Sequence, residues 1–264
     1  MAAIRVVVHG ALGKVGQEVV RAVCAEPDMK LVGAVDVKPA GDSLTLPDGS
    51  GKVPISADVN TILDKYPADV MVDFSVAKAS MPAVRTASKK KVNLVIGTTG
   101  FSAAELDEMK NLAAANKTGV VIAPNFALGA VLMMHLAKVA AKYMDFAEII
   151  ELHHHLKADA PSGTAASTAR AMVASRGKPF SRPADPVKPS ESRGEAVESV
   201  SIHAIRLPGL MAHQEVIFGA PGQTLSIRHD TINRECYMPG VILAIKEVAK
   251  RREFIYGLDT LLNL

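Results

Sequence analysis

Short apolar runs alternate with amphipathic segments from residue 4 to about residue 123. The runs are Ile4–Val8, Leu31–Val35, Val70–Phe74, Val92–Ile96 and Val120–Ile122. Uninterrupted runs rich in valine and isoleucine are typical of strands buried on both faces of a parallel sheet. Between the first two runs, Val15, Val19 and Val23 recur at helical spacing, which predicts a connecting helix. We therefore expect βαβ units with right-handed crossovers, forming a Rossmann-like parallel sheet.

The pattern changes after residue 126. A helical stretch from Ala127 to Tyr143 is followed by strand-like runs with few helices between them. These runs are Ala147–His155, Ser199–Arg206, Gln214–Phe218 and Thr224–Arg228. Successive strands favour a mixed or antiparallel sheet, so we expect a second domain of α+β type.

A last helix is predicted over Pro239–Lys250, and we expect it to pack back on the first domain. The chain then divides into a dinucleotide-binding domain, residues 1–126 with 238–264 packing back onto it, and a substrate-binding and oligomerisation domain, residues 127–237. Residues 180–198 are rich in proline and charge. They predict a long loop that serves as a lid, forms an oligomer contact or is disordered.

Composition narrows the class of protein. A chain of 264 residues can bury a sizeable core without disulfides. Aromatic residues make up only 4% and tryptophan is absent, which argues against a base-stacking surface for nucleic acid. Cys24 and Cys236 match no metal-ligand spacing and indicate a reduced compartment. Without a signal-peptide layout or a membrane-spanning apolar run, we expect a cytoplasmic protein that binds no membrane.

A glycine-rich turn follows the first predicted strand directly and opens the first predicted helix. Gly10 permits the tight turn, Gly13 lets a pyrophosphate approach the backbone, and Gly16 allows close packing of the helix. Two residues rather than one separate Gly10 from Gly13, a small departure from the commonest dinucleotide fingerprint. The residues expected to bind the cofactor here are Gly10, Ala11, Leu12, Gly13, Lys14 and Val15.

The second predicted strand ends at Asp36, twenty residues past Gly16, where a carboxylate accepts hydrogen bonds from the adenosine ribose. That position favours NADH. Lys38, two residues further on, suits a 2′-phosphate, so NADPH is also expected as a cofactor. The alternative is that both are ordinary residues of the loop after the strand.

Two more loops follow predicted strands, at the sheet edge where open α/β sheets bind ligands. Their members expected to bind the cofactor are Gly97, Thr98, Thr99, Ala123, Pro124, Asn125 and Phe126. Phe74 and Ser75 end a third strand and are expected to line the nicotinamide. Either loop taken alone is equally well explained by turn chemistry.

The most informative stretch is residues 151–165. If the strand continues that far, alternation places His153, His155 and Lys157 on one face and His154 on the other. Such a cluster suits acid–base chemistry.

A turn at residues 159–163 then begins a helix. Free backbone N–H groups at a helix start suit a substrate carboxylate, with the hydroxyls of Ser162 and Thr164 assisting. The simpler alternative is a solvated strand end followed by an ordinary capped helix. Three consecutive histidines also suggest zinc, but no carboxylate or cysteine at ligand spacing completes a site, so we expect no metal.

These motifs resemble the 4-hydroxy-tetrahydrodipicolinate reductase family, also called dihydrodipicolinate reductase. The family pattern is a His-His pair, two residues, Lys, one residue, then Asp-Ala-Pro-Ser-Gly-Thr, and His153–Thr164 fits it in full. The similarity covers nearly the whole chain. It also rests on Gly10–Gly16, Gly97–Gly100, Ala123–Phe126, Arg206–Gly209 and His213–Val216.

The resemblance implies a reaction and roles. His153 would supply a proton, Lys157 would aid protonation and charge stabilisation, and His154 with Gly163 and Thr164 would hold a small dicarboxylate substrate. The family reduces 4-hydroxy-tetrahydrodipicolinate to tetrahydrodipicolinate with NADH or NADPH in lysine and diaminopimelate biosynthesis. Its second domains commonly build a homotetramer through their sheets, and the same is expected here.

Two other functions deserve comparison. A relative of aspartate-semialdehyde dehydrogenase would need a catalytic cysteine after a central loop, and neither cysteine is so placed. A redox-sensing regulator that has lost catalysis would have no need of the proton donor that the pair His153 and Lys157 provides. The sequence therefore favours a reductase.

Overall fold

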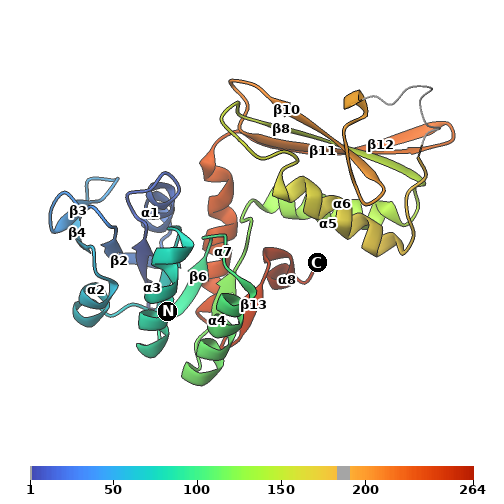
Figure 1. Cartoon of the computed structure of the whole chain (residues 1–264). Coiled ribbons are helices and arrows are strands. Elements are labelled where there is room, and N and C mark those ends of the chain that lie inside the picture. Colours follow the sequence, from blue (N-terminus) through green and yellow to red (C-terminus); the bar gives the residue numbers. More distant parts are fainter. Residues whose placement is uncertain (1, 183–190) are drawn as a thin grey trace. The chain divides into compact units, whose positions relative to one another are not determined.

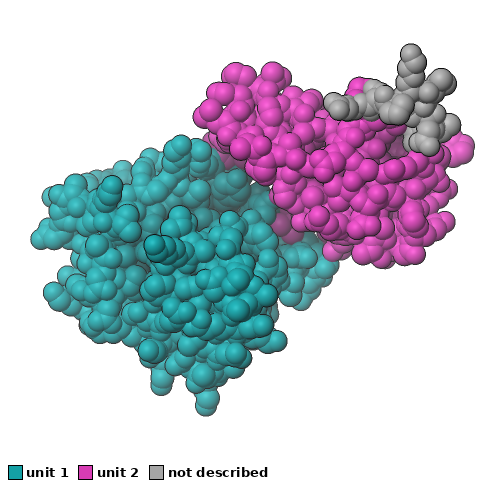
Figure 2. Space-filling view, in the orientation of Figure 1, with its two compact units in different colours: residues 1–128, 234–264 teal, residues 129–233 magenta. Residues whose placement is uncertain are grey.

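The structure, a computed structural model, describes residues 2–182 and 191–264. It divides into two units: residues 1–128 with 234–264 form unit 1, and residues 129–233 form unit 2 (Figures 1 and 2). Unit 1 therefore contains two separate segments of the chain.

Unit 1 is built on a sheet with the strand order β13-β7-β6-β5-β1-β2-β4-β3. Neighbouring strands run parallel except for β3 and β4, which are antiparallel. The strands are β1 (Ile4–His9), β2 (Met29–Val35), β3 (Ser43–Thr45), β4 (Lys52–Ser56), β5 (Val70–Asp73), β6 (Asn93–Ile96), β7 (Val120–Ile122) and β13 (Phe254–Tyr256). The predicted Rossmann-like parallel sheet is confirmed.

Helices cover this sheet in two groups. In one, α1 packs against α7, which also contacts β6; in the other, α3 packs against both α2 and α4. Unit 1 contains α1 (Gly16–Ala25), α2 (Val59–Lys65), α3 (Ala77–Lys89), α4 (Ala103–Asn116), α7 (Met238–Val248), α8 (Leu258–Leu262) and the 3₁₀ turn η2 (Arg234–Tyr237). The central strands β5 and β6 are buried along their whole length, because helices lie over both of their faces.

Three short strands of unit 1, β3, β4 and β13, were not predicted from the hydrophobic pattern of the sequence. In β3 no residue is buried, β4 contains Pro54, and β13 has a single buried residue, Ile255. Each lies at or next to an edge of the sheet, where few side chains reach the core. Edge strands of this kind carry little periodic signal.

The described part of unit 2 forms a five-stranded mixed sheet with two helices. Its strand order is β12-β11-β8-β10-β9, in which β8 and β10 are parallel and the other pairs are antiparallel. Its elements are α5 (Leu128–Ala141), β8 (Phe146–His153), α6 (Gly163–Arg176), the 3₁₀ turn η1 (Glu191–Arg193), β9 (Glu195–Val197), β10 (Val200–Arg206), β11 (Ala212–Ala220) and β12 (Gln223–Thr231). The predicted α+β layer with a mixed sheet is confirmed.

Among the described residues of unit 2, helices cover one face of the sheet. In Figure 1, α5 and α6 lie along the same side of β8, β10 and β11. The core between them includes Ile149, Met172 and Phe218, all fully buried. Alternate residues of the strands point to the opposite face, which remains partly open.

The loop predicted over residues 180–198 is described only in part. Residues 191–197 form η1 and β9, while residues 183–190 lie outside the described residues. Within the described ranges, no helix combines the length and apolar character needed to cross a bilayer.

Candidate active site

The glycine turn is held against two neighbouring strands. The N–H groups of Gly10 and Ala11 both donate to the carbonyl of Val35, at 2.8 and 3.2 Å. Gly10 has a φ of +78°, and a Cβ there would lie 2.5 Å from the carbonyl oxygen of Phe74. A Cβ on Gly16 would lie 1.9 Å from the oxygen of Gly10. Both positions therefore require glycine for the turn itself to close.

Gly13 is different, because its open side faces solvent. A Cβ there would contact only the Gly10 oxygen, at 3.1 Å, and Gly13 and Lys14 are both exposed. Helix α1 begins three residues later, at Gly16, so its first N–H groups and the positive end of its dipole lie beside this bare backbone. This arrangement fits a cradle for the pyrophosphate of a dinucleotide.

Asp36 and Lys38 lie in the loop that follows β2. Asp36 Oδ2 accepts the N–H of Leu12 at 2.9 Å, so this carboxylate already braces the glycine turn. Lys38 is exposed. An ionised carboxylate has about four acceptor positions, so Asp36 retains capacity for a ribose hydroxyl.

The loops after β5 and β6 are joined by Asp73, which the sequence analysis did not single out. The N–H of Ser75 donates to Asp73 Oδ1 at 2.9 Å and to Thr98 Oγ1 at 2.8 Å. The hydroxyl of Ser80 also donates to Asp73, and His9 Nδ1 lies 3.3 Å away. Burial disfavours the charged carboxylate, yet the nearby His9 and hydrogen bonds from Ser75 and Ser80 hold the pKa of Asp73 below its usual range. Thr98 is thus fixed in the interior, while Thr99 is exposed.

The fourth loop, residues 123–126, is partly structural. Asn125 Oδ1 accepts the N–H of Ala127 at 2.9 Å, while Pro124 is exposed. The Phe126 side chain is 2% exposed, and its ring centroid lies 5.7 Å from that of Phe74. The Phe126 ring therefore serves the core of unit 1.

In unit 2, strand β8 ends at His153. The predicted strand Ala147–His155 is therefore too long, and the condition under which His155 and Lys157 would share a face with His153 is not met. The chain turns instead, with the N–H of Lys157 donating to the carbonyl of His154 at 3.1 Å. His154 and His155 are exposed, whereas the Lys157 side chain is 21% exposed and its Nζ donates to both oxygens of Asp159 at 2.7 Å.

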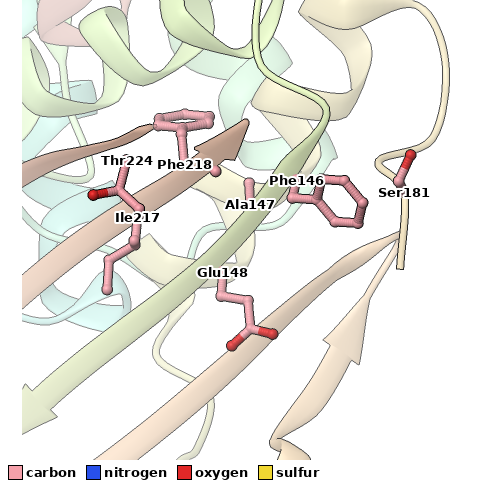
Figure 3. Close-up of a pocket in the computed structure, with 8 residues that line it drawn as sticks. Phe146, Ala147, Glu148, Ser181, Ile217, Phe218 and Thr224 are labelled. Atoms are coloured by element: carbon pink, nitrogen blue, oxygen red, sulfur yellow. The ribbon is translucent and has the colours of Figure 1, made fainter. Parts of the chain in front are cut away.

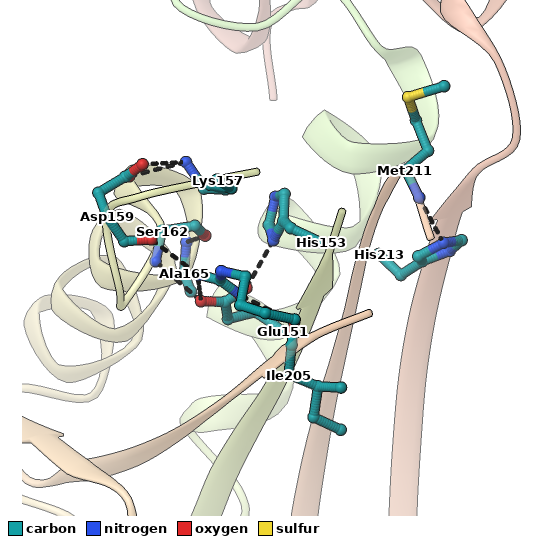
Figure 4. Close-up of polar contacts among 10 residues, drawn as sticks. Glu151, His153, Lys157, Asp159, Ser162, Ala165, Ile205, Met211 and His213 are labelled. Carbon is teal, nitrogen blue, oxygen red and sulfur yellow. Dashed lines mark hydrogen bonds and ion pairs between the residues drawn. The ribbon is translucent and has the colours of Figure 1, made fainter. Parts of the chain in front are cut away.

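His153 faces a buried acid. Its Nδ1 lies 2.5 Å from Glu151 Oε2 (Figure 4). Arg206 donates to both oxygens of Glu151, at 2.7 and 2.8 Å. Burial alone would raise the pKa of Glu151, but hydrogen bonds from His153 and Arg206 lower it to about 2. The sequence did not predict the ion pair between Glu151 and Arg206, because 55 positions separate the two residues.

Helix α6 begins at Gly163, with Ser162 as its N-cap. Ser162 Oγ accepts the N–H of Ala165 at 3.2 Å, and Ser162 itself is 3% exposed. Its hydroxyl therefore caps the helix rather than being held ready for a ligand. The N–H groups of Gly163 and Thr164 belong to the first turn, where no earlier turn supplies acceptors.

The same end of unit 2 thus combines His153, Lys157 and the start of α6, as Figure 4 shows. An imidazole, an ammonium group and free amide N–H groups can donate a proton and hold an anion. Among residues 2–182 and 191–264, no group of three or more His, Cys, Asp or Glu is arranged to hold a metal ion.

A hollow of about 230 Å³ lies at the opposite end of β8 (Figure 3). It is lined by Phe146, Ala147, Glu148, Ser181, Ile217, Phe218, Gly219 and Thr224. Its carboxylate, Glu148, is already paired with Arg193 at 2.9 Å and His203 at 2.8 Å. The hollow contains none of the predicted site residues.

Comparison with known proteins decides the family. Residues 4–126 match the family model for the N-terminus of dihydrodipicolinate reductase, and residues 129–262 match that for its C-terminus. The chain belongs to the dihydrodipicolinate reductase family. The resemblance inferred from the His153–Thr164 block is therefore confirmed.

Individual relatives agree over the full length. The 4-hydroxy-tetrahydrodipicolinate reductase of Dehalococcoides mccartyi strain 195 is 56% identical over 264 residues, covering 100% of both chains. That of Moorella thermoacetica is 46% identical, covering 100% of this chain and 99% of the relative. A solved dipicolinate-bound dihydrodipicolinate reductase from Paenisporosarcina sp. TG-14 matches with 39% identity and a TM-score of 0.87, covering 97% and 98% of the two chains.

Membership of the dihydrodipicolinate reductase family makes this chain an NAD(P)H-dependent oxidoreductase of lysine and diaminopimelate biosynthesis. The predicted enzyme class, reaction and nicotinamide cofactor are confirmed. The cradle beside Gly13 fits such a cofactor.

Proposed function

We propose that His153 is the proton donor when this chain reduces 4-hydroxy-tetrahydrodipicolinate to tetrahydrodipicolinate. The observation that carries the assignment of His153 is its buried partner: Glu151 accepts a hydrogen bond from one ring nitrogen and orients the other. Lys157 and the start of α6 belong to the same block of sequence and the same end of unit 2. Family membership supports the reaction, and this geometry supports the residue.

Each remaining group of unit 2 has a role in the proposal. Lys157 stabilises the negative charge that develops on the substrate during reduction, because an ammonium group favours nearby negative charge. His154, Gly163 and Thr164 bind a carboxylate of the dicarboxylate substrate, with the two amide N–H groups as donors. Asp159 orients the Lys157 ammonium group, which donates to both of its carboxylate oxygens.

In unit 1 we assign cofactor binding to the glycine turn and three loops. Gly10–Val15 hold the pyrophosphate, Asp36 and Lys38 face the adenosine ribose, and residues 97–99 and 123–126 flank the nicotinamide. When bound, NADH or NADPH supplies the hydride. The fixed position of Thr98 on Asp73 supports this assignment, since a rigid loop orients a ligand without losing entropy on binding.

We also propose a homotetramer in the cytoplasm, assembled through the open face of the unit 2 sheet. That face carries Ile150, Leu152, Ile205 and Ile217, all partly exposed or exposed on neighbouring strands. Charged side chains surround them, including Glu215 and Arg228. A partly apolar sheet face with a charged surround suits burial against a second copy.

The test supplies the product of dihydrodipicolinate synthase and follows NADH absorbance. We expect the absorbance to fall, and His153→Gln to lower kcat roughly 100- to 1,000-fold, as for loss of a general acid, while the Kd for NADH stays unchanged. Wild-type protein that binds NADH but leaves the absorbance constant would refute the reaction. A normal kcat for His153→Gln would remove that residue from the role.

A further inference from the structure

Glu151 is an ionised side chain in a fully buried position. It lies on the helix-facing side of β8 and is 0% exposed. Burying a charge is unfavourable unless partners replace the lost water. Here both oxygens are occupied: Arg206 binds the two of them, His153 binds Oε2 at 2.5 Å, and the N–H of Ser162 donates to Oε1 at 3.1 Å.

These partners come from separate parts of unit 2. His153 ends β8, Arg206 ends β10, and Ser162 caps α6. Arg206 also donates to the carbonyl of Asp159 at 2.7 Å, so it holds the loop that carries Lys157 and its partner. A single carboxylate thus connects the proposed proton donor to the proposed anion-binding helix start.

The contact with His153 also determines which ring nitrogen carries hydrogen. An ionised carboxylate only accepts hydrogen bonds, so His153 Nδ1 must be the protonated nitrogen facing Glu151. An imidazole that gives up its Nε2 proton must keep the proton on Nδ1. An acceptor opposite Nδ1 stabilises this form and turns Nε2 away from the strand.

We propose that Glu151 is a positioning residue for the reaction: it fixes the tautomer and orientation of His153 and, through Ser162, aligns the proton donor with the start of α6. This inference rests on the proposed function for the role of His153. Glu151 itself contacts no substrate atom in the proposal.

The chain provides a matched control on the same strand. Glu148 also binds one histidine and one arginine, His203 and Arg193, but it points to the open face of the sheet. Glu151→Gln is expected to lower kcat at least about 100-fold, with the Kd for NADH within twofold. Glu148→Gln is expected to leave both within about twofold, the usual result for a pair outside the site. Equal effects of the two substitutions would overturn the proposal.

A double-mutant cycle separates positioning from general loss of structure. If Glu151 acts through His153, adding Glu151→Gln to His153→Gln lowers kcat by less than about threefold more. If Glu151 only stabilises the fold, the two effects multiply. Multiplication would contradict the proposal.

A measurement on the wild-type chain needs no variant and no substrate. The ¹⁵N NMR signals of the His153 ring are expected to show a protonated Nδ1 in the neutral imidazole. A neutral ring protonated on Nε2 instead would overturn the inference even if Glu151→Gln fails to fold. Since this result does not depend on turnover, failure of the proposed reaction would be recognised separately, as an absence of NADH oxidation.

Discussion

At the scale of single residues, Asp36 is the side chain that we expect to influence the preference for NADH over NADPH most directly. Its Oδ2 accepts the N–H of Leu12, so the side chain both supports the glycine turn and places a negative charge beside the proposed ribose site. A phosphate at the ribose 2′ position would be repelled by that charge. The exposed Lys38 would attract the same phosphate.

Asp36→Asn separates the two roles of this side chain. The amide oxygen can still accept from Leu12, but the charge is removed, so we expect the ratio of kcat/KM for NADH over NADPH to fall roughly tenfold, a difference of about 1.4 kcal/mol. Steady-state kinetics with each cofactor measure the ratio, and Lys38→Met should move it the other way. A constant ratio in Asp36→Asn would show that another group sets the preference.

Glu151 also predicts how stability depends on pH. Its pKa is about 2 in the folded chain against an ordinary value of 4.5, so its stabilisation is complete above about pH 4.5 and declines as the pH falls toward 2. The full contribution is about 3 kcal/mol. Urea unfolding between about pH 6 and about pH 3 should show wild type losing more stability than Glu151→Gln. Parallel losses would contradict this, and Glu148→Gln should behave as wild type.

At the scale of elements, the start of α6 is where local structure and proposed binding coincide. Ser162 caps the helix with its hydroxyl while its own N–H is held by Glu151. In unit 1, Ser102 caps α4 in a capping box with Glu105 but has no proposed ligand. The two serines therefore make a matched pair.

Ser162→Ala should destabilise the protein by about 1 kcal/mol, because the Ala165 N–H loses its acceptor. It should also raise the KM for the dicarboxylate severalfold, since the first turn of α6 is then less ordered. Ser102→Ala should lower stability by a similar amount and leave KM unchanged. Thermal unfolding and steady-state kinetics provide the measurements, and a raised KM in both variants would refute the special role of α6.

The elements also show what sequence can and cannot reveal. The strands β1, β5 and β6 are continuous apolar runs because helices cover both faces, so their pattern is strong. The pattern predicts a strand to His155, but β8 ends at His153, because the chain turns over residues 154–157. A short periodic pattern does not fix an element's end.

In the candidate site, local motifs were predictable and long-range partners were not. The block from His153 to Thr164 was recognisable because its residues are adjacent in sequence. Asp73 and Glu151 gain their roles from partners that pairing between distant strands brings close, such as Thr98 and Arg206. No spacing rule along a single segment reports those contacts.

At the scale of the whole molecule, the open face of the unit 2 sheet governs assembly in our proposal. Ile150 lies in its middle strand, β8, between His203 on β10 and Glu215 on β11. Ile150→Glu would place a charge in the proposed interface next to Glu215. Such a like-charge contact disfavours association.

We expect Ile150→Glu to convert the tetramer into smaller species, as measured by light scattering coupled to size-exclusion chromatography. Leu136→Glu, at a residue 50% exposed on α5, is the control and should leave the tetramer intact. A tetrameric Ile150→Glu protein would place the interface elsewhere.

The sheet of unit 1 contains two segments of the chain that are synthesised at different times, with unit 2 between them. Strand β13 pairs with β7, and α7 packs on β6, so the segment 234–264 closes an edge and a face that residues 1–128 leave bare. On the ribosome, all of unit 2 emerges before that segment does. Until β13 is synthesised, the β7 edge of unit 1 is therefore unpaired and can form hydrogen bonds with strands other than β13.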